Sequence, residues 1–99
     1  HHTEARALKH YLNEGYELRG ERVKIAGVEI DLVFQTPQCT VFVEVKTLSE
    51  RALLVGRLSA KQKSRLFKAK CFYESTHQTP VEVRLALVSR DEIIDLVIL

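Results

Sequence analysis

Two alternating apolar runs, separated by a short break, constrain this chain more than any other feature. They lie within VEIDLVFQTPQCTVFVEVK, residues 28–46. Side chains of a β-strand point alternately to opposite faces, so Val28–Phe34 and Thr40–Lys46 each predict a half-buried strand. The residues between them, Gln35–Cys39, include Pro37 and have the length of a hairpin loop. We expect the rest of the chain to be organised around this hairpin.

The hairpin register follows from the apolar pattern. A shift of one residue would turn the apolar face of one strand to the opposite side of the sheet. Both apolar faces therefore lie on one core only if the residue numbers of each opposed pair add up to an odd number. The simplest such register sets Asp31 opposite Glu44, and Glu29 opposite Lys46. Directly opposed Cβ atoms lie about 4.5–5.5 Å apart, and two opposed carboxylates repel each other. A hard divalent cation would remove this repulsion, because Mg²⁺ typically binds one or two carboxylates and keeps several waters.

The pattern D…ExK on two adjacent strands therefore indicates a metal-dependent site for phosphodiester hydrolysis. Asp31 and Glu44 would bind the metal, with the carbonyl of Val45 as an additional ligand. Lys46 projects on the same face and would hold a nucleophilic water or meet charge on a phosphate. The alternative interpretation is a solvated strand face with an ordinary cross-strand ion pair, because short motifs also occur by chance.

The first helix is predicted over Thr3–Glu14, with Thr3 as its N-cap and Gly15 following its end. Glu4 lies three residues before the inward-facing apolar stripe. An acidic residue in a first helical turn is a favourable partner of the helix dipole. The same placement also suits a third carboxylate of the site. Both interpretations stay open at the level of the sequence.

The second helix is predicted over Ser59–Ser75. Ser59 and Gln62 match a capping box, in which the two side chains satisfy backbone groups of the first turn. In the alternative interpretation, Gln62 supports the site by reaching toward Glu44 and Lys46. The two interpretations predict different roles for the same amide.

Three further strands complete the predicted fold. They fall within Tyr16–Ala26, Val81–Ser89 and Ile93–Leu99, and the last is expected at a sheet edge. A helix on each face of the sheet would bury both apolar stripes. The predicted fold class is α/β, with a mixed sheet of about five strands flanked by two main helices.

Length and composition indicate one small globular domain, which we expect over residues 3–99. His1 and His2 look like the remnant of an expression tag. The two cysteines match no metal-binding spacing, and no long apolar run or secretory pattern is visible. We therefore expect a cytoplasmic protein with no membrane contact.

The small net charge of +2 hides a strongly basic segment. Between Thr47 and Lys70, seven cations against one anion give a charge of +6, so the rest of the chain carries about −4. The residues predicted to contact nucleic-acid phosphates are Arg57, Lys61, Lys63, Arg65 and Lys68. A solvated helix face is the alternative. The aromatic residues interleaved with them, Phe67, Phe72 and Tyr73, are predicted to lie in the core.

The ordered set TEARALKHYLNEGY, VEIDLV, TVFVEVK and a basic helix resembles the YraN-type family of small, largely uncharacterised bacterial proteins. This resemblance covers roughly residues 3–89. It implies a restriction-endonuclease-like fold, similar to that of the archaeal Holliday junction resolvases. Carried over by position, the family's helical glutamate is Glu4, its metal-binding aspartate is Asp31, and its ExK element is Glu44 and Lys46.

The resemblance also implies how the remaining residues act, and where this chain departs from the family. Glu29 precedes the metal-binding aspartate and would support it. Gln62 stands where a family lysine is expected, and Arg84 stands at a strand position that often carries aspartate.

Three functions are compatible with these features. The first is a Mg²⁺- or Mn²⁺-dependent nuclease acting on DNA, including branched or damaged DNA, with the catalytic set Glu4, Asp31, Glu44 and Lys46. The second is a nucleic-acid-binding module of the same fold that does not cleave. The third is a small protein-interaction domain that docks a partner through Leu53–Val55. A homodimer is compatible with each of them.

Overall fold

The chain folds as a β-sheet placed between two helices, in a computed structural model that describes residues 2–48 and 58–99. We predicted roles for Arg57 and for the Leu53–Val55 segment from the sequence, and both lie outside the described residues. The described elements are α1 (His2–Asn13), β1 (Glu17–Ile25), β2 (Val28–Gln35), β3 (Thr40–Thr47), α3 (Ala60–His77), β4 (Val81–Val88) and β5 (Ile93–Val97).

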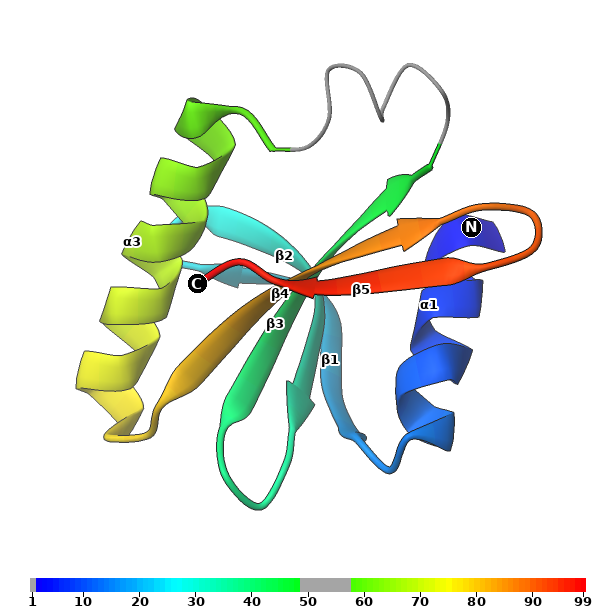
Figure 1. Cartoon of the computed structure of the whole chain (residues 1–99). Helices are drawn as coiled ribbons and strands as arrows, with labels where there is room; N and C mark the ends of the chain where they lie inside the picture. The colour runs from blue at the N-terminus through cyan, green and yellow to red at the C-terminus, as the bar shows by residue number, and fades with distance from the viewer. Residues whose placement is uncertain (1, 49–57) are drawn as a thin grey trace.

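The five strands form one sheet in the order β1-β2-β3-β4-β5. The β3–β4 pair is parallel and the other pairs are antiparallel. Figure 1 shows α3 and α1 on opposite sides of this sheet. The predicted fold class, a mixed sheet of about five strands with two main helices, is confirmed. Neither described helix combines the length and apolar composition needed to cross a membrane.

Each helix covers its own hydrophobic core. Leu66 and Ala69 of α3 pack with Phe42, Val83 and other buried residues on one side of the sheet. On the other side, buried residues of α1 pack with residues of β2, β3 and β4; they include Ala7, Tyr11, Phe34, Val41, Val43 and Ala86. Because β3 and β4 are covered on both faces, they form the centre of the fold, and Glu44 and Lys46 project from β3.

Strand β2 is divided between the two cores. The alternating pattern predicted that Val28, Ile30, Leu32 and Phe34 would share one face. Leu32 and Phe34 pack against α1, whereas Ile30 and Val28 pack in the core beneath α3. The prediction was wrong for the first half of β2. The β2–β3 ladder ends at the pair Leu32 and Val43, so the first half of β2 pairs with β1 and not with β3. Because the sheet twists, this half turns away from β3.

The helix ends only partly match the predictions. Helix α1 begins at His2, so Thr3 lies within its first turn instead of capping it. The Thr3 hydroxyl lies 3.4 Å from the hydroxyl of Thr47, at the end of β3. Gly15 follows the helix with a φ of +90°, as expected for a residue that ends a helix.

The second helix begins as predicted. Ser59 Oγ accepts a hydrogen bond of 3.1 Å from the Gln62 amide, and Gln62 Oε1 accepts one of 3.1 Å from the Ser59 amide. Of the aromatic residues predicted in the core, Tyr73 packs edge-on against Phe42 with ring centroids 5.4 Å apart. Phe67 and Phe72 are each 52% exposed, so the prediction was wrong for both.

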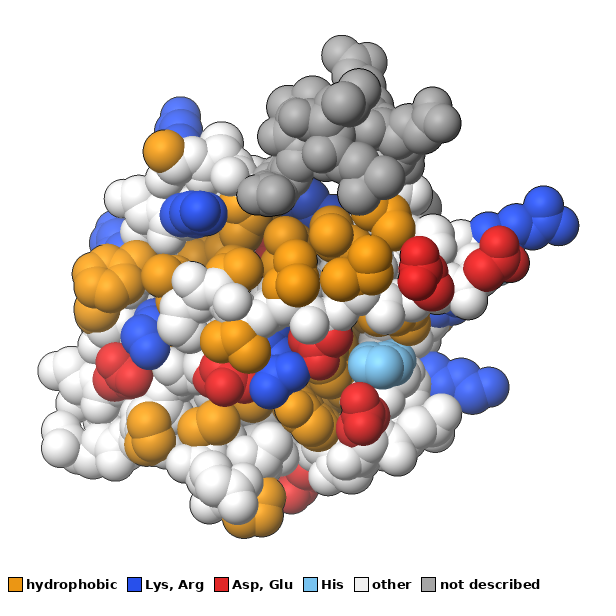
Figure 2. Space-filling model, viewed as in Figure 1, with side chains coloured by type: hydrophobic (Ala, Val, Ile, Leu, Met, Phe, Trp, Pro, Cys, Tyr) orange, Lys and Arg blue, Asp and Glu red, His pale blue; other side chains and the backbone are white. Residues whose placement is uncertain are grey.

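Strand β5 is an edge strand, as predicted. Figure 2 shows hydrophobic side chains gathered over this strand. Leu96 and Val97 contribute to them with exposed fractions of 40% and 57%. Edge strands with exposed apolar side chains are surfaces on which proteins associate.

A buried polar contact joins α1 to β5. The hydroxyl of Tyr11, which is fully buried, donates a hydrogen bond of 2.8 Å to Asp95 Oδ1. The other carboxylate oxygen of Asp95 accepts a hydrogen bond of 2.7 Å from Arg84. Arg84 also donates to Glu82. This network ties the first helix to the last strand, across the face of β4.

Replacing Tyr11 with phenylalanine should lower the free energy of unfolding by about 1–3 kcal/mol, because Asp95 loses one buried hydrogen-bond donor. The control is Tyr16→Phe. The Tyr16 hydroxyl donates no hydrogen bond within the described residues, so its removal should change the free energy of unfolding little. Urea unfolding of the two variants and the parent measures both effects. Equal losses in the two variants would contradict the assigned role of Tyr11.

Candidate functional site

Asp31 lies where β2 separates from β3. The last pair of their ladder is Leu32 and Val43, and the same register sets Asp31 against Glu44, as the sequence predicted. Asp31 Oδ2 accepts a hydrogen bond of 2.8 Å from the backbone amide of Val45. The aspartate side chain thus satisfies a backbone donor of β3 after the strand pairing has ended, and this bond fixes the position of the carboxylate.

Glu44 is a half-buried carboxyl group beside Asp31. Burial is the largest cause that raises its pKa, followed by a side-chain hydrogen bond with Asp31 and by the charge of Asp31. Lys46 opposes this shift and Glu4 adds to it, so the pKa of Glu44 is raised to about 8. All four residues of the predicted catalytic set are therefore close enough to interact electrostatically. Two carboxyl groups this close repel each other when both are ionised, and a proton or a cation between them removes the repulsion.

Glu4 is directed to the site by α1. It precedes the buried Ala7 by three residues, so it lies on the inward side of the helix, and its side chain is 20% exposed. Glu4 Oε2 accepts a hydrogen bond of 2.8 Å from Arg22 Nη2 in an ion pair. Arg22 has a φ of 49°, a left-handed conformation that is uncommon for a residue with a side chain. Arg22 was not predicted from the sequence, because no spacing relates α1 to the middle of β1.

These residues fit a small hard cation held mainly by two side chains. Within residues 2–48 and 58–99, no three or more histidine, cysteine, aspartate or glutamate side chains form a metal-binding group. Asp31 and Glu44 would supply two carboxylate ligands to such an ion, and backbone oxygen, water or phosphate would supply the others. This is the ligand set that Mg²⁺ ordinarily accepts in proteins, since it binds one or two carboxylates and retains waters.

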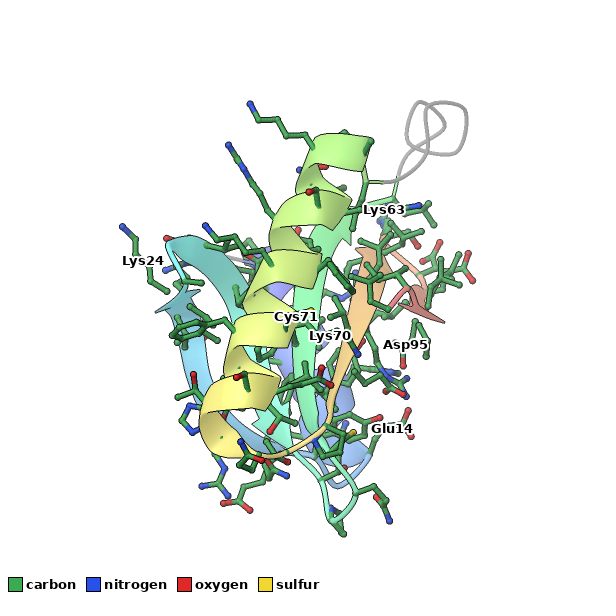
Figure 3. All side chains as sticks on the ribbon, turned by 90° about the vertical axis from the view of Figure 1, so that its left-hand side faces the viewer. Glu14, Lys24, Lys63, Lys70, Cys71 and Asp95 are labelled. Atoms are coloured by element: carbon green, nitrogen blue, oxygen red, sulfur yellow. The ribbon has the colours of Figure 1, made fainter. Side chains whose placement is uncertain are left out.

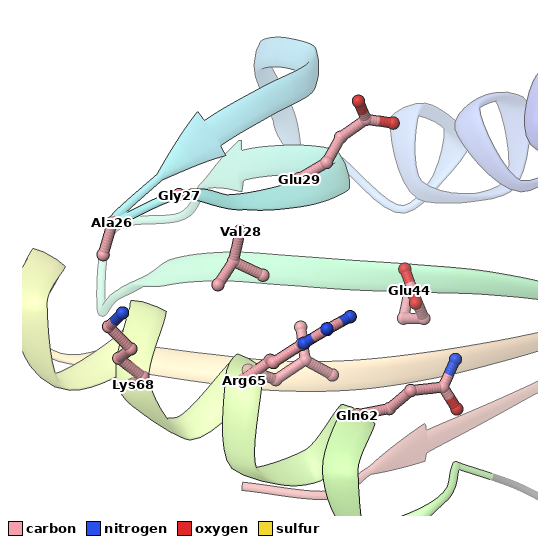
Figure 4. A pocket seen from close by; sticks show the side chains of 9 residues that line it. Ala26, Gly27, Val28, Glu29, Glu44, Gln62, Arg65 and Lys68 are labelled. Carbon is pink, nitrogen blue, oxygen red and sulfur yellow. The ribbon is translucent and has the colours of Figure 1, made fainter.

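A cavity of about 490 Å³ opens beside Glu44, between α3 and the β1–β2 turn. Figure 4 shows Arg65 and Gln62 extending from α3 toward Glu44, and Lys68 extending toward the turn at Ala26. Both interpretations of Gln62 are compatible with this geometry. Its Oε1 closes the capping box, and the figure shows its amide on the side of Glu44.

The other predicted residues are placed differently. Glu29 lines the same cavity as Glu44, but it is exposed, lies opposite Lys24 of β1 in the strand register, and points away from α3 in Figure 4. Lys63 lines a different cavity beside β5. Figure 3 shows Lys63 and Lys24 on opposite sides of α3. Lys61 is exposed at the start of the helix. Of the predicted phosphate contacts, Arg65 and Lys68 are therefore the two that line the cavity with Glu44.

The comparisons with known proteins agree with the sequence motifs. The model of a family described as uncharacterised protein family UPF0102 matches residues 3–98. The chain belongs to the UPF0102 family. It is 35% identical over 89 residues to a UPF0102 protein of Shewanella amazonensis, covering 88% of this chain and 82% of that protein. It is 30% identical over 86 residues to a UPF0102 protein of Maricaulis maris, covering 83% and 68%. The predicted YraN-type membership is confirmed, and the UPF0102 description names no activity.

The raised pKa of Glu44 predicts a pH-dependent stability in the metal-free protein. Protonated Glu44 is favoured in the folded state, so its contribution is complete below pH about 4.5 and is lost as the pH rises through about 8. Glu44→Gln should therefore raise the melting temperature above pH 8 by a few degrees, with a smaller gain as the pH falls.

Thermal unfolding in the presence of a chelator, at several values between pH 4 and pH 9, measures this effect. Glu92→Gln, which removes an exposed glutamate of the β4–β5 turn, is the matched control and should not change the pH profile. A Glu44→Gln profile parallel to that of the parent protein would contradict the assigned burial and pairing of Glu44.

Proposed function

We propose that this UPF0102 protein is a Mg²⁺- or Mn²⁺-dependent nuclease that hydrolyses phosphodiester bonds of structured or damaged DNA in the cytoplasm. The observation that carries the proposal is the half-buried pair Asp31 and Glu44, set together where β2 leaves β3. The Val45 amide needs one acceptor, which Asp31 supplies, so this contact gives no reason for a second half-buried carboxyl group at Glu44, which costs stability at neutral pH. Perturbed carboxyl groups beside a cavity are typical of functional sites.

The acidic pair would hold the ion. Asp31 is oriented by the Val45 amide through one carboxylate oxygen, which leaves its other oxygen to act as a ligand. Glu44 would contribute the second carboxylate, and the carbonyl of Val45 is the expected backbone ligand. When bound, the ion supplies Lewis acidity toward a phosphoryl oxygen and makes a bound water more acidic.

Lys46 would act on the substrate rather than on the ion. It follows Glu44 by two residues on the same strand face, and its charge lowers the pKa of Glu44. An ammonium group in this position would orient the attacking water and offset the negative charge that develops on the phosphate. Glu4, held by Arg22, would accept a hydrogen bond from a water at the site.

A second candidate function is a nucleic-acid-binding module that does not cleave. The ion pair of Glu4 with Arg22 supports this candidate, because it occupies the third carboxylate of the predicted catalytic set. In this case the acidic pair would still bind a cation that bridges to a phosphate. Turnover separates the two candidates.

The metal-binding role of Asp31 is tested with Asp31→Asn. The asparagine oxygen can still accept the hydrogen bond from Val45, so the fold should be retained while the charge is lost. We expect the affinity for Mn²⁺, measured by isothermal titration calorimetry, to fall at least about tenfold. Removing a group that only supports a metal ligand already has an effect of this size. Equal heats from the parent protein and the variant would exclude Asp31 as a ligand.

The role of Lys46 is tested by measuring cleavage and binding separately. Lys46→Ala should lower the single-turnover cleavage rate by about 10²–10³, the usual effect of removing one preorganised stabilising group. DNA affinity and Mn²⁺ affinity should change little. Lys46→Arg should restore little activity, because a planar guanidinium does not replace a compact ammonium.

Lys63→Ala is the matched control, since this lysine lines the cavity on the other side of α3. The measurements use one branched DNA substrate with Mn²⁺, and compare all variants on it. Cleavage at the parent rate by Lys46→Ala would show that the catalytic role is wrong. Binding of metal and DNA without turnover in the parent protein, across branched and linear substrates, would favour the non-cleaving module.

A further inference from the structure

Two neighbouring cavities lie along α3, beside the β1–β2 hairpin. Their volumes are about 490 and 350 Å³, and Ala26 lines both of them. The first is lined by Glu44, and the second by Phe72, ten residues along the helix from Gln62. We call these two neighbouring cavities the α3 groove.

Cations outnumber carboxylates in the α3 groove. Arg65 and Lys68 line its first cavity together with Glu29 and Glu44, and Lys24 and Arg19 line its second. Among the ion pairs of the described residues, Arg19 pairs loosely with a neighbouring glutamate, and none involves Lys24, Arg65 or Lys68. The second cavity has no aspartate or glutamate in its lining. Cations that are not already paired are available to neutralise phosphates.

Phe72 places an exposed aromatic ring in the same groove. Arg65, Lys68 and Phe72 stand at i, i+3 and i+7, a spacing that puts them on one side of α3. Phe72 is 52% exposed although it lines a cavity, so its ring is accessible to a ligand. Phe67 is also 52% exposed but lines neither cavity. Cationic side chains that follow a groove containing an exposed ring are the features that bind single-stranded nucleic acid.

We infer that the α3 groove binds one unpaired strand of nucleic acid, with phosphates on Arg65, Lys68 and Lys24 and a base stacked on Phe72. This inference rests on the proposed nuclease function, because the strand would lead to the acidic pair at Glu44. An unpaired strand is required, since the bases of a duplex are stacked on each other and do not offer their faces to a side chain.

The length of the groove sets the size of the bound segment. Gln62 and Phe72 are separated by ten residues of helix, or about 15 Å along its axis. Fully stacked nucleotides rise about 3.4 Å each along a strand, and unstacked ones rise more, so at most about four nucleotides would span the distance. The substrate class of the site is therefore a strand with an unpaired segment of this length next to the cleaved bond.

Tryptophan fluorescence tests the inference, because the chain contains no tryptophan. Phe72→Trp and Phe67→Trp each introduce a single reporter at equally exposed positions of α3. Each variant is titrated, in the presence of a chelator, with an oligothymidylate of about twelve nucleotides and with a blunt duplex of the same length. We expect the single strand to quench the emission of Phe72→Trp strongly and that of Phe67→Trp weakly, and the duplex to quench neither strongly.

A binding measurement accompanies the fluorescence. Phe72→Ala should weaken the affinity for the labelled oligothymidylate about fivefold or more, whereas Phe67→Ala should leave it unchanged. Melting temperatures of all four variants show whether the fold is retained. Equal quenching at positions 67 and 72, equal loss of affinity in the two alanine variants, or equal quenching of Phe72→Trp by duplex and single strand would overturn the inference.

The outcome is separable from that of the nuclease proposal, because no divalent metal is present and no bond is broken. Selective quenching of Phe72→Trp in a protein that never cleaves DNA with Mn²⁺ would support the groove and reject the nuclease. Cleavage by a protein whose position 72 does not respond to single strands would reject the groove and support the nuclease.

Discussion

The hydrogen bond from the Val45 amide to Asp31 is the interaction on which the rest of the site depends. It satisfies the backbone of β3 at the point where β2 leaves the ladder. Because β2 is then free to follow β1, their hairpin turn comes to face α3 across a cavity. Glu44 immediately precedes Val45, so the same bond holds Asp31 beside a second carboxyl group. The repulsion between the two carboxyl groups and the cavity beside them therefore have the same structural origin.

The elements and the acidic pair could be predicted from the sequence because both depend on local periodicity. Alternation in two short runs gives the strands, and an odd residue sum between them gives the register that sets Asp31 against Glu44. The capping box at Ser59 is likewise a local signal, and it fixes where α3 begins. The predicted roles of these side chains in metal binding and catalysis stay predictions.

What the sequence did not reveal depends on the curvature of the sheet and on contacts between distant elements. Strict alternation assumes a flat strand, and it assigned Ile30 to the wrong core because β2 twists away from β3. The pairing of Arg22 with Glu4 follows from where α1 lies on the sheet, which no spacing encodes. Phe72 was predicted in the core because the sequence shows no exposed cluster of aromatic residues, yet α3 turns it into the groove beside the β1–β2 hairpin.

Whether the acidic pair binds a metal can be seen in a crystal soaked in Mn²⁺, because anomalous scattering locates the ion without relying on activity. We expect one strong anomalous peak between the carboxylates of Asp31 and Glu44, at ligand distances close to the 2.0–2.1 Å that is typical of Mg²⁺. Occupancy should rise with pH as Glu44 loses its proton. A peak at another group of carboxylates, or no peak at the acidic pair at alkaline pH, would contradict the account.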